Sequence, residues 1–392
     1  GSAGLGQEHP SHMMAWGDFD GDGWLDLFVG NETSTESGFR PSQLFHNQRD
    51  GTFVDVAEDV GLRIRSFVKG AHWGDIDLDG RPDLMISNLS EPNMLWHNQG
   101  PAEDGGWRFV DVSSTAGVRD FMESFPPWFW DYDNDGDDDI FVNAWRASTG
   151  DVAAEYMGRP FRAEHPRLYR NRGDGVFDDV TVSAGLTKVM YTMGTNFGDL
   201  DGDGFLDFYV GTGDPDFRAM MPNRMFRNVA GERFEEVTVA GGFGHLAKGH
   251  GAAFGDVDHD GDQDVYIVLG GAYEGDVFRN VLLENTGPVR RWVSLELEGV
   301  QSNRSAIGAR IHVRLKEGRS VHRTVNSGGS FGASPLRQWF GLGDADAIDF
   351  VEVWWPTSGV RQRFEDVAVD QHYMLREDAD ALMARELPSF KF

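Results

Sequence analysis

The stretch Asp18-Phe-Asp-Gly-Asp-Gly-Trp-Leu-Asp26 decides the fold of this 392-residue chain. It is the first of five copies of one pattern, D-x-D-x-D-G-x-x-D, and the other copies begin at Asp75, Asp131, Asp199 and Asp256. Glycine occupies the sixth position of every copy and permits the tight curl that directs four carboxylates at one centre. Hard oxygen ligands in a flexible loop suit Ca2+ better than Mg2+, which requires a stricter octahedron. The pattern therefore predicts five Ca2+ sites.

Each predicted site takes its ligands from positions 1, 3, 5, 7 and 9 of its loop. Side-chain carboxylates serve at four of these positions, and position 7 offers its backbone carbonyl. The loops carry neither Cys nor inward-spaced His, so a softer metal is not expected. The expected ligands are, loop by loop, Asp18, Asp20, Asp22, Trp24 and Asp26; Asp75, Asp77, Asp79, Arg81 and Asp83; Asp131, Asp133, Asp135, Asp137 and Asp139; Asp199, Asp201, Asp203, Phe205 and Asp207; and Asp256, Asp258, Asp260, Asp262 and Asp264.

An EF-hand is the main alternative interpretation of such a loop. An EF-hand requires a bidentate Glu at position 12 and a helix on each side. The residues that follow each loop are instead apolar and β-prone, as in Leu27-Phe-Val29, so the loops are expected to join β-strands. Position 12 of the five loops is occupied by Val29, Ile86, Val142, Val210 and Ile267.

Composition narrows the possible partners. The chain carries 64 acidic and 35 basic side chains, and its net charge of -29 argues against nucleic acid and anionic membrane surfaces as partners. No apolar run approaches the length of a membrane span, and no signal peptide is visible at Gly1. The absence of Cys excludes disulfides and Cys nucleophiles. Extracellular calcium sites often bind at about 10⁻⁴–10⁻³ M, which the cytosol does not supply. A secreted or periplasmic monomer is expected.

The loops recur at spacings of 57, 56, 68 and 57 residues, which is typical of a stacked or radial repeat. An aromatic residue precedes each loop, and an apolar–aromatic–basic–Asn motif follows it, as in Leu44-Phe-His-Asn47. In the fifth repeat this motif is assigned to Val277-Phe-Arg-Asn280. Each repeat is expected to contain four short strands with the acidic loop between the first two, and this arrangement predicts a β-propeller blade. The preceding aromatic residues are Trp16, Trp73, Phe129, Phe197 and Phe254.

The repeats resemble the FG-GAP/VCBS repeats of integrin-type propellers over roughly residues 9–287. After residue 288, the stretches Asn303-Arg-Ser-Ala-Ile-Gly-Ala-Arg310 and Val351-Glu-Val-Trp-Trp-Pro356 are similar to the ASPIC/UnbV module. Together the two parts resemble the cartilage acidic protein family and its bacterial relatives. The resemblance implies an acidic, calcium-binding and largely extracellular protein, and it implies a fold more firmly than a biochemical activity.

An all-β chain in three segments is expected. Residues 1–287 are predicted to form the propeller repeats, residues 288–378 an ASPIC/UnbV-like β module, and residues 379–392 a short helix, from Ala379 to about Glu386, with a tail. The chain length divided by the repeat period is close to seven. The preferred arrangement is therefore a seven-blade-like ring in which the module fills the last one or two places. A separate sandwich beside a smaller propeller is the alternative.

Strand order separates two faces of such a ring. The calcium loops join first to second strands on one face, and the links between second and third strands lie on the opposite face. The opposite face is expected to carry a long insertion, Asn143 to Arg167, and a second irregular link that contains Asp214, Asp216 and Arg218. The innermost strands also begin there. Polar residues near their starts can converge at the mouth of the central channel, namely His12, Lys69, Glu123, Tyr191 and His250.

Two functions from different classes fit these features. The preferred function is a calcium-stabilised propeller that binds a protein, glycan or small-molecule ligand on the face opposite the calcium loops. The alternative is a calcium-dependent enzyme, a tailoring cyclase, transferase or hydrolase acting on a small, hydrophobic molecule. The channel-mouth residues would be its catalytic groups. A deep, closed pocket with a perturbed His or Lys pKa favours the enzyme, and a shallow face favours the binding protein. The sequence shows no nucleophile motif, phosphate loop or cofactor fingerprint.

Overall fold

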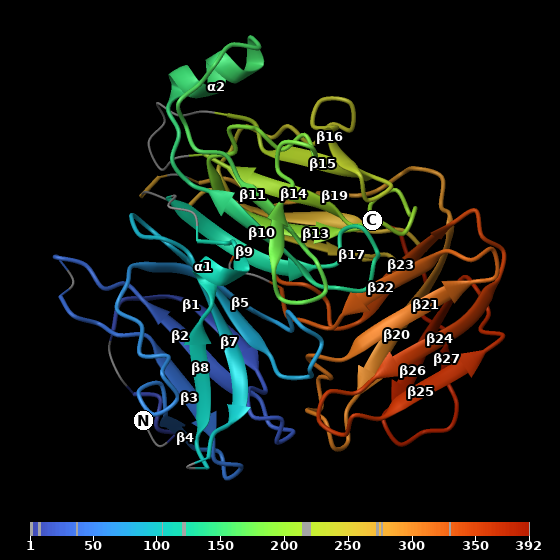
Figure 1. Cartoon of the computed structure of the whole chain (residues 1–392). Coiled ribbons are helices and arrows are strands. Elements are labelled where there is room, and N and C mark those ends of the chain that lie inside the picture. The colour runs from blue at the N-terminus through green and yellow to red at the C-terminus, as the bar shows by residue number, and fades with distance from the viewer. Residues whose placement is uncertain are drawn as a thin grey trace.

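The computed structural model describes residues 3–6, 9–36, 38–103, 105–119, 123–213, 221–271, 274–275, 277–328 and 331–391. This part of the chain is all-β, as predicted, and its strands form seven separate sheets (Figure 1). The first five sheets, here called blades 1 to 5, follow one another along the chain. The last two sheets form the C-terminal module, drawn in orange to red.

The strands of each blade pair antiparallel in chain order, and the acidic loop joins the first strand to the second. Blade 1 contains β1 (Ser11–Gly17), β2 (Asp26–Asn31), β3 (Gln43–Asn47) and β4 (Phe53–Asp55); blade 2 contains β5 (Val68–Gly74), β6 (Asp83–Asn88), β7 (Met94–Pro101) and β8 (Trp107–Asp111). Blade 3 contains β9 (Ser124–Trp130), β10 (Asp139–Ala144), β11 (Arg167–Asn171) and β12 (Phe177–Asp179). Blade 4 contains β13 (Thr192–Gly198), β14 (Asp207–Thr212), β15 (Arg224–Val229) and β16 (Arg233–Glu236), and blade 5 contains β17 (Gly249–Gly255), β18 (Asp264–Leu269) and β19 (Val281–Leu283).

Consecutive blades pack face to face, and the aromatic residue before the loop of blades 2, 3 and 5 covers a glycine of the preceding blade. The Trp73 ring lies directly over Gly17 of the preceding blade, where a Cβ atom would come within 2.8 Å of it. Phe129 covers Gly74 and Phe254 covers Gly198 in the same way. Glycine is needed at these positions because the neighbouring ring occupies the space of a side chain. The propeller core is therefore divided into clusters that each span two or more neighbouring blades.

The succession of blades is open at both ends. Trp16 of blade 1 has no preceding blade to cover, and it is 40% exposed, whereas Trp73 is 8% exposed. At the other end, Pro335 of the C-terminal module lies against Gly255 of blade 5, the position that a following blade's aromatic ring would cover. The module segment near Gly332 also makes an isolated parallel bridge to β17. The module therefore covers the exposed side of blade 5.

The C-terminal module is a sandwich rather than two further blades. One sheet has the order β23-β20-β26-β27 and the other β22-β21-β24-β25, and a single hydrophobic core lies between them. Strands β20 and β26 pair in parallel, unlike any pair in the blades of the described chain. Of the two arrangements considered from the sequence, the structure has the separate sandwich, and the preferred seven-blade-like ring is wrong. The bounds are β20 (Arg291–Glu298), β21 (Arg310–Leu315), β22 (Ser320–Thr324), β23 (Gln338–Gly343), β24 (Ile348–Trp354), β25 (Arg361–Glu365), β26 (Gln371–Arg376) and β27 (Met383–Arg385).

Helical structure differs from the expectation in two places. The helix predicted after Ala379 is absent from the described residues, since Met383–Arg385 instead form β27 and pair with β26. The long insertion contains an unpredicted helix, α2 (Thr149–Tyr156), which projects from blade 3 (Figure 1). A capping box between Ser148 and Asp151 begins α2. A one-turn helix, α1 (Ser113–Ala116), follows β8. Among the described residues, no helix combines the length and the apolar character that a membrane span needs.

Candidate functional site

Four of the five acidic loops share one hydrogen-bonding pattern. In the first loop, both Asp18 carboxylate oxygens accept backbone N–H groups, from Asp22 and Gly23, at 2.9 Å. The same two bonds recur in the loops that begin at Asp75, Asp131 and Asp199. The glycines at position 6 have φ of 88° to 101°, the left-handed region that glycine adopts most easily. The curl predicted from the sequence is present.

The aspartate at position 9 is fixed by the third strand of the same blade. The two Asp26 carboxylate oxygens accept the backbone N–H groups of Phe19, at 3.2 Å, and Asn47, at 2.8 Å. Asn98, Asn171 and Asn228 donate in the same way to the position-9 aspartates of blades 2 to 4. The Asn of the apolar–aromatic–basic–Asn motif therefore orients a predicted metal ligand.

The assignment of this motif in blade 5 is wrong. The residue that donates to Asp264 is Asn285, at 2.9 Å, and not Asn280, whose side chain donates to Tyr266. The sequence holds a signal for the correct position, because Asn285-Thr-Gly-Pro288 matches Asn98-Gln-Gly-Pro101 in blade 2. The Val-Phe-Arg-Asn stretch imitates the motif but precedes the strand.

The same asparagines join each loop to the loop before it. The Asn98 side chain donates to the Phe19 carbonyl of the first loop at 2.8 Å. Asn171, Asn228 and Asn285 donate to the equivalent carbonyl of the loop in the preceding blade, at 2.8 to 2.9 Å. Asn47, in the first blade, donates within its own loop, to Leu25. The five loops are thus connected in series.

Carboxylates at positions 1, 3 and 9 come together as a divalent cation requires. Their ligand oxygens lie within 4.8 Å of one another in the first three loops. Burial raises the pKa of Asp18 to about 6 and that of Asp26 to about 8, and neighbouring carboxylates add to both shifts. In the described chain, one buried oxygen each of Asp133 and Asp201 has no hydrogen-bond partner. Several crowded, buried acceptors with few donors fit a hard cation, which would satisfy them together.

Basic side chains from the third strands adjoin the loops, and the loop pattern by itself does not predict them. His46, from β3, lies 3.0 Å from Asp20, and His97, from β7, lies 3.0 Å from Asp83. In blade 4 the corresponding Arg227 lies 3.7 Å from Asp201. These residues are the basic position of the apolar–aromatic–basic–Asn motif, so the signal was present in the sequence. Groups behind a metal ligand commonly orient it, and these side chains are placed for that role.

The C-terminal module covers all five loops. At every position-6 glycine the space that a Cβ atom would take is bordered by the module. For example, a Cβ at Gly23 would come within 2.2 Å of the Gln301 carbonyl oxygen, and one at Gly261 within 2.3 Å of the Trp292 ring nitrogen. Trp354, His322 and Arg319 are the nearest side chains at the other three glycines. The face that carries the predicted metal sites is therefore an internal interface.

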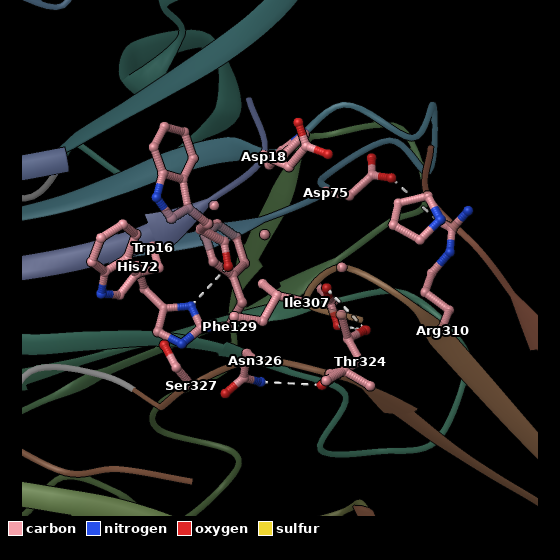
Figure 2. Close-up of a pocket in the computed structure, with 18 of the residues that line it drawn as sticks. Trp16, Asp18, His72, Asp75, Phe129, Ile307, Arg310, Thr324, Asn326 and Ser327 are labelled. Atoms are coloured by element: carbon pink, nitrogen blue, oxygen red, sulfur yellow. Dashed lines mark hydrogen bonds and ion pairs between the residues drawn. The ribbon is translucent and has the colours of Figure 1, made fainter. Parts of the chain in front are cut away.

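A narrow slot of about 60 Å3 remains inside this interface (Figure 2). Trp16 and Phe129 from the blades and Asn326 and Ser327 from the module line it. His72 also lines it; its Nδ1–H donates to the Trp73 carbonyl at 2.9 Å, and burial lowers the His72 pKa to about 4. His72 is therefore a packed residue of this interface. The volume is that of a few water molecules, well below a typical small-molecule site.

The predicted channel-mouth residues lie at the opposite face in separate surroundings. Lys69 is ion-paired with Glu32 at 2.5 Å, and Tyr191 is 4% exposed and packs against Trp145. Glu123 is ion-paired with Arg146 at 2.8 Å. His250 is half-buried at the start of β17, and the side chain of His12 lies outside the described residues. A catalytic role for these five residues stays a prediction.

Aromatic packing fills the centre beside these residues. Phe125, at the start of β9, is 3% exposed and stacks on Trp145 with ring centroids 6.3 Å apart. Phe125 also stacks on Phe331 of the C-terminal module, with ring centroids 5.3 Å apart, so the module reaches the middle of the propeller. Lys69 lies 5.8 Å from the Phe125 ring.

The long insertion forms a polar groove of about 400 Å3 on this face. Glu123 and Arg146 line one part of it, and Asp151, Arg162 and Glu164 line the remainder. Next to the groove, α2 presents Tyr156 and Met157, which are 54% and 58% exposed. The second irregular link, with Asp214, Asp216 and Arg218, lies outside the described residues.

A buried ion-pair network holds the insertion on blade 4. Arg224, whose side chain has no exposed surface, donates to Glu155 of α2 at 2.8 Å and also to Glu236. Lys188 lies 3.3 Å from Glu155. Because a guanidinium binds two carboxylates in fixed geometry, α2 and the groove are held in place rather than hanging from the blade.

Two family models match the chain. The FG-GAP-like repeat model matches residues 18–86, 75–142 and 143–210, and the ASPIC and UnbV model matches residues 299–382. The chain belongs to the FG-GAP-repeat proteins that carry an ASPIC/UnbV domain. The resemblance predicted from the sequence is confirmed, and the C-terminal module is the ASPIC/UnbV domain of this family member.

Cartilage acidic protein 1 of Homo sapiens is 30% identical over 197 residues, which are 48% of this chain and 26% of that protein. The Mus musculus protein of the same name is 29% identical over 197 residues, 48% of this chain and 27% of that protein. The chain thus spans about a quarter of the length of these relatives. Among solved structures, Saccharomyces cerevisiae Sqt1 aligns with a TM-score of 0.38 and 9% identity, over 96% of this chain and 80% of Sqt1.

Proposed function

We propose that this FG-GAP/ASPIC protein is a calcium-stabilised binding protein that takes a protein partner on the face opposite its acidic loops. The observation that carries the proposal is the position of the C-terminal module, which covers the loop face and leaves the groove face open. The FG-GAP repeat fold fits a ligand- or partner-binding role in general. Calcium is then a structural ion in each blade, and a secreted or periplasmic location supplies it.

The ligands of each Ca2+ are the position-1, 3, 5 and 9 carboxylates, with the position-7 carbonyl, as predicted from the sequence. The support is their convergence, the raised pKa values and the buried oxygens of Asp133 and Asp201 that lack hydrogen-bond partners in the described chain. Bound calcium would neutralise the repulsion within each loop and stabilise the joint between two strands.

The groove and α2 form the proposed recognition surface. Interfaces between proteins are enriched in aromatic side chains, Met and Arg, and this surface offers Tyr156, Met157, Arg146 and Arg162. The groove carries both signs of charge, which suits a protein segment better than a neutral sugar chain. The ion pairs of Arg224 keep the surface preorganised, and preorganisation lowers the entropic cost of binding.

Calcium titration by calorimetry tests the first half of the proposal. We expect five bound ions per chain and a melting temperature that falls when a chelator is added. A protein that binds no calcium, or that melts at the same temperature with and without chelator, would contradict it.

Affinity capture with an Arg146→Ala/Arg162→Ala variant tests the second half. Extracellular proteins of the source organism are the sample, and Arg376→Ala, an exposed arginine of β26, is the matched control. A partner retained by the wild type and the control but lost by the groove variant supports the proposal. Equal retention by all three proteins contradicts it. If the wild type captures no protein but binds sugars on a glycan array, the partner is a glycan and the proposed protein partner is wrong.

The enzyme alternative remains a separate prediction. The feature expected of an enzyme is a deep, closed pocket with a His of perturbed pKa. His72 has a lowered pKa, but the slot that it lines has a volume of only about 60 Å3. The groove is open to solvent, and of the five predicted channel-mouth residues Glu123 alone lines it. The geometry therefore favours binding.

A further inference from the structure

The module contacts the backbone of the acidic loops as well as their side chains. In the fourth loop, three consecutive carbonyl oxygens accept hydrogen bonds from the module. Gly202 accepts from the backbone of Gly343 at 2.8 Å, Asp203 from Arg319 at 2.6 Å, and Gly204 from Arg323 at 3.0 Å. These carbonyls belong to position 5, whose side chain is a predicted ligand, and to positions 4 and 6 on either side of it.

Other loops are contacted at a predicted ligand or at a residue next to one. The Thr357 hydroxyl donates to Asp18 at 3.1 Å, and Arg310 donates to Asp75 at 3.3 Å. The backbone N–H of His322 donates to the side chain of Asn134 in the third loop, at 3.1 Å. In the fifth loop, the Asp258 carbonyl accepts from the backbone of Phe390 at 2.9 Å.

These contacts depend on the curled shape of the loops. The position-6 glycines leave no room between loop and module, so a loop that opened would lose its hydrogen bonds and its packing together. An empty loop has four carboxylates in close proximity, and their repulsion favours opening. A bound cation favours the curled shape, which is the shape that the module contacts.

We propose that calcium binding and docking of the C-terminal module are reciprocally linked, with Arg319, Arg310 and Thr357 as module residues that set the calcium affinity of loops they do not ligate. The inference rests on the proposed calcium sites. If the module docks better on curled loops, thermodynamics requires the linkage. Calcium and the module then stabilise the same curled state, so each increases the affinity of the loops for the other. The module is thus a cap whose attachment reports the calcium level outside the cell.

Limited proteolysis of the full chain, at a range of free Ca2+ concentrations, tests the docking half. We expect the link between β19 and β20, near Arg290, to become cleavable as calcium is removed, and the Trp292 and Trp354 fluorescence to shift over the same range. A module that stays protected and spectroscopically unchanged in the chelated protein, while the calorimeter shows that calcium has left, overturns the inference. Failure of the protein to bind calcium at all instead overturns the proposed function.

Calcium titration of module variants tests the affinity half. Arg319→Ala removes the donor to Asp203 and changes no predicted ligand. We expect at least about a fivefold loss of calcium affinity in one site, within the usual range of coupling between sites. Thr357→Val, which keeps the size of the side chain, is expected to weaken the first site. Arg376→Ala, on the module sheet but paired with Asp378, is the matched control and should titrate like the wild type.

The variants decide whether module residues set the calcium affinity of the loops. If Arg319→Ala and Thr357→Val both bind calcium like the wild type while remaining folded by circular dichroism, the module does not set the affinity. If the Arg376 control loses affinity equally, the effect is one of net charge and the inference fails.

Discussion

Asp201 illustrates how a single residue is expected to act in opposite directions with and without calcium. One of its oxygens is buried without a hydrogen-bond partner in the described chain, and it lies among other carboxylates of the fourth loop. Asp201→Ala should lower the melting temperature in excess Ca2+, because a ligand is lost. In chelator the same variant should melt at or above the wild-type temperature, because repulsion is relieved. Thermal melts under both conditions check the reversal, and a lower midpoint in both would count against a cation at this loop.

The raised pKa values of the loop carboxylates predict how pH acts on the chelated protein. Asp26, at about 8, and Asp75, at about 7, hold protons in the folded chain more tightly than the unfolded chain does, mainly because they are buried. Their contribution to stability is therefore present at low pH and lost as pH rises through 7 to 8. His72, with its pKa lowered to about 4, acts in the opposite direction below about pH 6.5.

The test is the melting temperature in chelator between pH 8 and pH 6.5. We expect the midpoint to rise as pH falls across this window, whereas in subsaturating Ca2+ protons should compete with the metal and reduce its stabilising effect. A chelated protein that loses stability from pH 8 to 6.5 would show that these carboxylates are not buried together.

At the scale of the elements, the asparagines at the ends of the third strands connect neighbouring loops. Asn98→Ala removes the bond to the Phe19 carbonyl and should weaken calcium binding in the first loop as well as the second. Asn47→Ala should affect the first loop alone, because its side chain donates to Leu25 within that loop. Calorimetric titration of the two variants distinguishes them, and identical profiles would mean that the loops act independently.

The elements that the sequence predicted well are those fixed by local chemistry. The loop pattern from Asp18 to Asp26 requires curling and is followed by apolar, β-prone residues, so loop and strand were both predictable. The helix α2 was missed although the Ser148–Asp151 capping box is present in the sequence. The stretch after Ala379 has helical character, yet β27 forms because β26 offers a free edge, and that edge exists only in the folded module.

In the candidate site, too, the features fixed by local sequence were predicted and those fixed by tertiary structure were not. The carboxylate ligands follow from the repeat, but His46 and the module's Arg319 approach the loops through tertiary structure. The repeat period did not indicate that the module lies over the loops, because the module has no such period and its contacts join residues up to 339 positions apart. The incorrect choice of Asn280 over Asn285 had a further cause, since the links between second and third strands vary in length and leave the motif without a fixed spacing.

At the scale of the whole molecule, the open end of the propeller predicts a difference between two equivalent tryptophans. Trp73 is packed between blades 1 and 2, whereas Trp16, in the same position of blade 1, is 40% exposed. Trp73→Ala should lower the free energy of unfolding by about 3–5 kcal/mol, as large-to-small changes in a core do, and Trp16→Ala by less than about 2 kcal/mol. Denaturant unfolding measures both. Equal losses would indicate that blade 1 is covered on both sides.

The contact between Thr357 and Asp18 has a consequence for how the chain reaches its native state. The two residues are 339 positions apart, and the module makes comparable long-range contacts with every blade. Closing such loops in the unfolded chain carries an entropic cost before any contact compensates for it, so folding slows as contacts become less local. The blades pair mainly within themselves and can form early, during synthesis. The final arrangement must wait for roughly the last hundred residues, which begin with β20 at Arg291. The slowest folding step is expected to be the arrival of the module on a propeller that is already built.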